Sequence, residues 1–108
     1  MFKVKFLEDA KQFLDSLDEK PRAKILYNIW KSKISKDQEL LKKFDNEIWE
    51  FRTLYNKSAY RLFAFWDESE NSMIIATHGI IKQTDKTPKR EIEKAHLLRI
   101  EYLKSKKK

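Results

Sequence analysis

The stretch WEFRTLYNKSAYRLFAFW, Trp49 to Trp66, decides the fold of this 108-residue chain. Two runs rich in aromatic and β-branched residues flank Asn56 and Lys57, which is the pattern of two antiparallel strands joined by a tight turn. A third such run, SMIIATHGIIK (Ser72 to Lys82), follows the polar segment DESEN. The pattern predicts strands over 48–55, 58–66 and 72–82 in an antiparallel meander.

The segments on either side of this meander predict helices and one further strand. Residues 2–6, FKVKF, alternate apolar and polar as a strand does, and from Leu7 to Leu17 the apolar residues fall at helical spacing. A second helix is expected over 21–34, and residues 37–43 favour a further helical turn. Thr87 and Pro88 mark the start of a last helix, which precedes a basic tail over 104–108. In the second helix the expected apolar stripe is Ala23, Leu26, Trp30 and Ile34, broadened by Ile25 and Ile29; in the last helix it is Ile92, Ala95, Ile100 and Leu103.

The predicted order is therefore β-α-α-β-β-β-α in a single domain over residues 1–108. This is an α+β fold: a small twisted antiparallel sheet, an N-terminal helical hairpin packed on it, and a C-terminal helix. The chain length suits one modest core.

Composition narrows the function. The net charge is +7, and residues 82–108 carry 10 Lys and Arg against 4 Asp and Glu. A basic end of this kind attracts a polyanion, an anionic lipid surface or an acidic protein. The chain has no Cys, which excludes disulfides and thiolate chemistry. It shows neither the apolar core of a signal peptide nor the roughly 18 apolar residues of a membrane span, so we expect a cytoplasmic protein without a membrane partner.

Strand counting places three cationic or titratable residues in one row. If Asn56 and Lys57 form a two-residue turn, Arg52 lies opposite Arg61, and a Trp66–Met73 pair would place Arg61 opposite His78. Glu50 lies on the same face as Arg52. Like charges in adjacent strands are costly unless a carboxylate or a bound anion compensates them. Two interpretations stay open at this point: a phosphate-binding site, or a structural ion-pair cluster beside a core histidine.

A histidine beside two arginines suits RNA cleavage by attack of the ribose 2′-hydroxyl on the adjacent phosphorus. That reaction needs a base, positive charge on the phosphorane and an acid, with neither metal nor cofactor. His78 and His96 lie 18 residues apart and no ligand spacing is present, so we expect no metal site. His96, near the apolar stripe of the last helix, is expected in the core or an interface. A single glycine excludes a Gly-rich phosphate loop.

Three motifs in order carry a family resemblance. They are Trp49-Glu50-Phe51-Arg52; Tyr60-Arg61 with aromatic residues following; and His78-Gly79 leading to Lys82, Lys86-Thr87-Pro88 and Glu91-Ile92. Together they resemble the HigB-type, phage-derived branch of the RelE/ParE toxin superfamily over nearly the whole chain. The resemblance implies a RelE-like fold and a toxin that cuts messenger RNA on the ribosome. It also implies a HigA-like helix-turn-helix antitoxin as partner, with a toxin–antitoxin heterotetramer as one open possibility for the oligomeric state.

The resemblance also implies roles for individual residues. Arg52 and Arg61 would hold the scissile phosphate, with Glu50 orienting them; His78 would transfer a proton, and Lys82 would stabilise developing charge. The residues expected to bind the RNA are Glu50, Lys86, Lys89 and Arg90. Where the family usually has two consecutive lysines, this chain has Lys82-Gln83, so the resemblance does not extend to one of the phosphate contacts.

Two other functions remain open from the sequence. One is a ParE-type toxin that inhibits gyrase, which shares the scaffold but acts on a protein; His78 and the arginine pair argue against it. The other is a noncatalytic basic module that binds nucleic acid. A purely structural domain ranks last because the basic end would then have no evident use.

Overall fold

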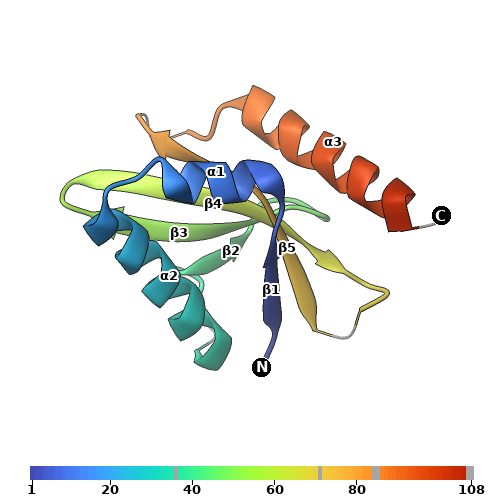
Figure 1. Cartoon of the computed structure of the whole chain (residues 1–108), viewed down its shortest axis with the longest axis horizontal. Helices are drawn as coiled ribbons and strands as arrows, with labels where there is room; N and C mark the ends of the chain where they lie inside the picture. The colour runs from blue at the N-terminus through green and yellow to red at the C-terminus, as the bar shows by residue number, and fades with distance from the viewer. Residues whose placement is uncertain (36, 71, 84–85, 107–108) are drawn as a thin grey trace.

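The computed structural model describes residues 1–35, 37–70, 72–83 and 86–106. Figure 1 shows a sheet with α1 crossing one of its faces and α3 as a separate helix near the C-terminus. The elements in chain order are β1 (Lys3–Phe6), α1 (Glu8–Asp15), α2 (Glu19–Ile34), β2 (Leu41–Lys43), β3 (Trp49–Tyr55), β4 (Ser58–Asp67), β5 (Met73–Lys82) and α3 (Lys89–Lys106).

The sheet has five strands in the order β1-β5-β4-β3-β2, and it is mixed because β1 runs parallel to β5. The observed order is β-α-α-β-β-β-β-α, so the predicted antiparallel sheet in RelE-like β-α-α-β-β-β-α order is wrong. Phe6 pairs with Ala76, and α1 then continues in the same direction along β5, where Phe13 lies against Gly79. Since strand and helix follow each other along β5, the strand must run parallel to it.

The additional strand, β2, lies where a further helical turn was expected. The Asp37 Oδ1 atom accepts a hydrogen bond from the Glu39 backbone N–H at 2.8 Å, which forms a turn in place of a helix. The Arg52 N–H then donates to the Leu40 carbonyl at 2.8 Å, and Leu41 pairs with Phe51. This short strand satisfies backbone groups of β3 that would otherwise lie at an open sheet edge.

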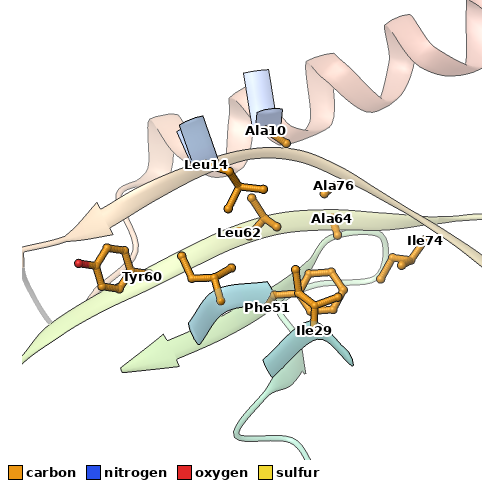
Figure 2. Packing of buried hydrophobic residues seen from close by; sticks show 10 residues of the cluster. Ala10, Leu14, Ile29, Phe51, Tyr60, Leu62, Ala64, Ile74 and Ala76 are labelled. Carbon is orange, nitrogen blue, oxygen red and sulfur yellow. The ribbon is translucent and has the colours of Figure 1, made fainter. Parts of the chain in front are cut away.

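Apolar side chains pack on both faces of the sheet. In the larger cluster, side chains of α1 and α2 pack against side chains of β3, β4 and β5, as Figure 2 shows. Its buried members are Ala10, Leu14, Ile25, Ile29, Phe51, Tyr60, Leu62, Ala64, Ile74 and Ala76. The cluster on the other face joins the sheet to α3: Ile48, Phe63, Phe65, Ile75, Ile92 and Ala95. The sheet is therefore a middle layer with a core on each side.

The buried face of α2 differs from the predicted stripe. Ile25 and Ile29 are buried, whereas Leu26, Trp30 and Ile34 are 43%, 51% and 57% exposed. The reason is that α2 turns a narrow face toward β3, where Asn28 donates a hydrogen bond to the Thr53 hydroxyl at 3.1 Å. Polar contact thus replaces part of the apolar packing that helical periodicity predicted.

The last helix is held on the sheet by polar contacts as well as by Ile92 and Ala95. Residues 104–106 of the expected basic tail continue α3, and the Lys106 Nζ atom lies 2.7 Å from the buried Asp67 carboxylate. Residues 107–108 lie outside the described part of the chain. Within the residues that the structure describes, no helix combines the length and apolar composition needed to cross a membrane.

Candidate functional site

The turn between β3 and β4 confirms the predicted pairing of the two arginines. Tyr55 pairs with Ser58, and Arg52 lies directly opposite Arg61. Asn56 and Lys57 have φ angles of 49° and 68°, as both central residues of a type I′ turn require. A two-residue turn leaves no freedom in the register, so the two guanidinium groups start from neighbouring positions on one face.

The predicted pairing of Arg61 with His78 is wrong. Trp66 pairs with Ile74, and an irregularity between Leu62 and Ala64 shifts the register further, so Arg61 lies opposite Ile80. His78 instead stacks beside Phe63, with ring centroids 4.9 Å apart. The extra residue of β5 at this bulge places His78 two positions away from Arg61 along β4.

His78 is buried, with only 3% of its surface exposed, and both ring nitrogens are engaged. Its Nδ1 atom lies 3.1 Å from the Thr77 hydroxyl, and its Nε2 atom lies 3.1 Å from Glu91 Oε1 on α3. Burial lowers the pKa of His78, as does the charge of Lys94, while Glu91 and Asp9 act in the opposite direction. In this arrangement His78 joins β5 to the first turns of α3.

The two arginines differ in their surroundings. Arg61 is 8% exposed; its Nη1 atom donates to the Tyr60 carbonyl at 3.1 Å, and its Nε atom has no hydrogen-bond partner among the described residues. Burial, and then the charge of Arg52, lower the pKa of Arg61, whereas Glu50 and Glu39 raise it. Arg52 is half-buried. In the part of the chain that the structure describes, Arg52 makes no side-chain hydrogen bond or ion pair.

The ion pair expected between Glu50 and an arginine does not form within the described residues. Glu50 is buried and its Oε1 atom accepts a hydrogen bond from the Thr87 hydroxyl at 3.0 Å. This contact fixes the segment that leads into α3 against β3. Glu50 therefore positions Thr87, and it acts on Arg61 through its charge without an ion pair.

A cavity of about 500 Å³ gathers half of the predicted cations. Its lining comes from β2, β3, β5 and the segment before α3, and we refer to it as the lysine cavity: Lys42, Lys43, Phe44, Glu50, Arg52, Lys82, Lys86 and Thr87. Five cationic side chains thus surround one carboxylate. Lys42 and Lys43 were not predicted from the sequence because β2 was expected to be helical; the adjacent basic pair after Leu41 was the only signal.

Other predicted residues lie outside this cavity. Arg61 and His78 are not in its lining. Lys89 and Arg90 are exposed at the start of α3, where the Arg90 Nε atom lies 3.6 Å from Glu91 Oε2. His96 is half-buried on α3 and lies 2.9 Å from Asp45 Oδ2. The predicted set is therefore divided: Arg52, Lys82, Lys86 and Glu50 converge, and the remaining members do not.

This geometry suits a phosphate-bearing ligand. Several cations from separate elements face one open cavity, whose volume lies within the range of about 300–1,000 Å³ usual for ligand sites. Arg52 can bind two phosphate oxygens with its planar fork, and the lysines act as mobile point charges. The fold and the cavity together define a small α+β protein with a basic cavity.

Comparison with known families assigns the chain to one of them. The family described as "Phage derived protein Gp49-like (DUF891)" matches residues 12–99, and the chain belongs to it. This is a toxin–antitoxin-associated family related to RelE-type toxins, which are of the endoribonuclease type. No curated protein matches the chain.

Proposed function

We propose that the protein is the HigB-type toxin of a type II toxin–antitoxin module and cuts messenger RNA during translation. The observation that carries the proposal is the convergence of Arg52, Lys82 and Lys86 on one cavity, together with Lys42 and Lys43 of β2. Membership of the Gp49-like family supports the assignment to a toxin. The reaction proposed is attack of the ribose 2′-hydroxyl on the neighbouring phosphorus, without a metal. The 2′ oxygen loses its proton and bonds to phosphorus, the bond from phosphorus to the 5′ oxygen breaks, and the 5′ oxygen takes up a proton, which leaves a 2′,3′-cyclic phosphate and a 5′-hydroxyl.

In this proposal Arg52 and the lysines act on the phosphate. The phosphorane formed by 2′ attack carries more negative charge than the ground-state diester, so fixed cations stabilise it preferentially. Arg52 binds its equatorial oxygens, and Lys82 and Lys86 neutralise the negative charge on the attacking 2′ oxygen and on the leaving 5′ oxygen. Arg61, directly opposite Arg52 on β4, adds positive potential.

His78 has a conditional part in the reaction. Its Nε2 atom is hydrogen-bonded to Glu91, so it can exchange a proton with substrate only after that contact opens. While the contact is closed, His78 is a positioning residue that holds α3 beside β5. Binding to the ribosome, which would also place the messenger RNA, is the step at which we propose that the contact opens.

The proposed partners follow from the same assignment. They are the ribosome with its messenger RNA, and a HigA-like helix-turn-helix antitoxin whose gene is adjacent. The proposed place of action is the cytoplasm, where translation occurs. Lys89 and Arg90, exposed at the start of α3, are proposed to contact the RNA backbone beside the lysine cavity.

Expression in growing bacteria without antitoxin tests the proposal. We expect the parent chain to halt growth and to produce new RNA ends only within translated regions. Arg52→Ala and Lys82→Ala should reduce these ends by roughly 100-fold, as loss of one group that stabilises a transition state does. Lys11→Ala, an exposed change on α1 outside the lysine cavity, should behave as the parent does.

The contrary result is growth arrest that persists in both variants while no chain produces new RNA ends. A gyrase supercoiling assay on the same variants would then identify a ParE-type toxin. Cleavage of free RNA by purified protein is a poor substitute, because the ribosome is expected to position the substrate.

A further inference from the structure

A second cavity, of about 400 Å³, lies between α2 and the sheet. Its lining includes Lys24, Asn28 and Lys31 of α2, together with Arg52 and Arg61 from β3 and β4. We refer to it as the α2 cavity. Arg52 lines both this cavity and the lysine cavity, so the two cavities share one residue.

The α2 cavity has an excess of positive charge. Four cations and one carboxylate, that of Glu39, line it. Lys24 and Lys31 are exposed and seven residues apart, which places them on the same face of α2 two turns apart. Neither lysine has a carboxylate within ion-pair distance in the part of the chain that the structure describes; Lys24 Nζ lies 5.5 Å from the ring centroid of Tyr27.

Arg61 provides a second, independent indication of a missing anion. More than nine-tenths of this residue is buried, it lines the α2 cavity, and its Nε donor has no partner among the described residues. It also lies directly opposite Arg52 across the β3–β4 pair. Within the described residues neither guanidinium group is bonded to a carboxylate. Burial, and then the charge of Arg52, lower the pKa of Arg61, and Glu50 and Glu39 raise it through their charge alone, so a bound anion would relieve the repulsion that remains between the two arginines.

The remaining polar groups of the cavity are already fixed in place. Asn28 and Thr53 are buried and bonded to each other at 3.1 Å, so this part of the lining is rigid. The floor of the cavity is therefore fixed, while the exposed lysine side chains above it can move to meet the oxygens of a phosphate group. Contacts between lysines and the phosphate backbone of a nucleic acid do not select for the identity of the bases.

We propose that the α2 cavity binds the phosphodiester next to the one held in the lysine cavity, so that a single-stranded RNA passes from one cavity to the other across Arg52. The inference rests on the proposed function, because it takes the same RNA as ligand, but it adds a site and residues that the cleavage reaction does not require. Lys24 and Lys31 bind the flanking phosphate, and Arg61 supplies positive potential from the cavity wall.

Fluorescence anisotropy tests this site without cleavage. The probe is a five-nucleotide, dye-labelled RNA whose 2′-hydroxyls are replaced by hydrogen, titrated with the full chain between 50 and 200 mM salt. For single strands, each phosphate that is no longer neutralised reduces the slope of log K against log salt by about 0.7. Lys24→Ala/Lys31→Ala removes both lysines from the one flanking phosphate, so it should reduce the slope by about 0.7 and weaken binding severalfold at the low-salt end.

A matched double variant controls for the change in net charge. Lys11→Ala/Lys20→Ala removes the same charge from exposed positions of α1 and α2 that line neither cavity, and it should keep the parental slope to within about 0.3. Circular dichroism should show the parental spectrum for both double variants, because all four lysines are exposed.

The outcomes separate this inference from the proposed function. Equal slopes for the two double variants, or a parent chain that does not bind the probe, would overturn the α2 site. If the slope depends on Lys24 and Lys31 while the parent produces no RNA ends in cells, the site stands and the cleavage proposal fails. If RNA ends form in cells but the slopes are equal, the cleavage proposal stands and the α2 site fails.

Discussion

The two faces of the sheet are held in different ways. On one face α1 and α2 pack through a continuous apolar cluster that includes Leu14, Ile29 and Leu62. On the other face Ile92 and Ala95 are the buried apolar residues of α3. This helix is held in addition by at least five polar pairs along its length: Glu91 with His78, Lys94 with Asp9, His96 with Asp45, Arg99 with Glu47, and Lys106 with Asp67.

The difference between apolar and polar packing predicts that the two faces contribute differently to stability. Apolar burial is insensitive to pH and weakly affected by salt, whereas exposed ion pairs contribute little and are screened. We therefore expect the α1/α2 face to set the global free energy of unfolding, and α3 to open at lower cost. The lysine cavity lies where both parts meet, since Thr87 before α3 bonds to Glu50 of β3.

Matched truncations on the two faces should show the largest effect. Leu62 is 1% exposed within the α1/α2 cluster, so Leu62→Ala should reduce the free energy of unfolding by about 2–5 kcal/mol. Ile92, 8% exposed on α3, lies at the margin of its cluster, and Ile92→Ala should cost about 2 kcal/mol, at the lower end of that range. Urea denaturation followed by tryptophan fluorescence measures both values.

Hydrogen exchange on the same pair of variants decides whether α3 is a separate unit. Ile92→Ala should accelerate exchange of α3 amides more than of α1 amides, because only the contact of α3 with the sheet is weakened. Leu62→Ala should accelerate both. Equal acceleration throughout the chain in the two variants would mean that the helix and the sheet open together, and the comparison between the faces would lose its basis.

The same contrast explains which features could be predicted from the sequence. Local patterns determined the strands at 48–55, 58–66 and 72–82, and the Asn56-Lys57 turn determined that Arg52 faces Arg61. The direction of β1 could not be predicted from the sequence, because Lys3 pairs with Met73 and no local pattern links residues so far apart. The bulge at Thr77 and His78 was equally invisible, since an extra residue in a strand leaves its composition unchanged.

The candidate site was predictable to the extent that it depends on that turn. Arg52, Lys82 and Lys86, which the family resemblance singled out, line one cavity. Lys42 and Lys43 belong to a three-residue strand that was expected to be helical. His78 was placed in the row of arginines by counting, and the bulge moved it beside Phe63 and under α3. The burial of His78 depends on the packing of α3 against β5, and the alternation of residues along a strand carries no information about that packing.

The histidine contact gives an intermediate effect that depends on pH. Burial lowers the folded-state pKa of His78 below its ordinary value of about 6.5. Between these two values the unfolded chain binds the proton and the folded chain does not, so stability is full above the ordinary pKa and falls as the pH falls below it. One proton contributes at most about 1.4 kcal/mol per pH unit.

Measurement of α3 opening at pH 7.5 and pH 5.5 checks this sign. Exchange of α3 amides, corrected for the intrinsic effect of pH, should indicate easier opening at pH 5.5 in the parent. His78→Gln retains a side chain that can bond to Glu91 but cannot titrate, and it should remove most of the difference. An unchanged pH dependence in that variant would assign the effect to another group.

The smallest effect is expected at the exposed pair of Lys94 and Asp9, which are 47% and 41% exposed and 3.2 Å apart. Lys94→Ala removes one ion pair, and exposed pairs of this kind are worth about 0.2–1 kcal/mol. The same charge also lowers the pKa of His78, so its removal allows that pKa to rise toward the ordinary value. We therefore expect Lys94→Ala to loosen α3 slightly at pH 7.5 and, at the same time, to flatten the pH dependence that His78 produces.

A second variant of the same pair separates the ion pair from its effect on His78. At pH 5.5, loss of the ion pair makes α3 easier to open, whereas the rise in the pKa of His78 makes it harder to open. The ratio of α3 exchange rates at pH 5.5 and pH 7.5 therefore separates the two effects better than either rate alone. Asp9→Asn breaks the same ion pair but removes a charge that raises the pKa of His78, so it should steepen the pH dependence. If both variants leave the ratio unchanged, the charges of Lys94 and Asp9 act only through the ion pair and His78 does not respond to them.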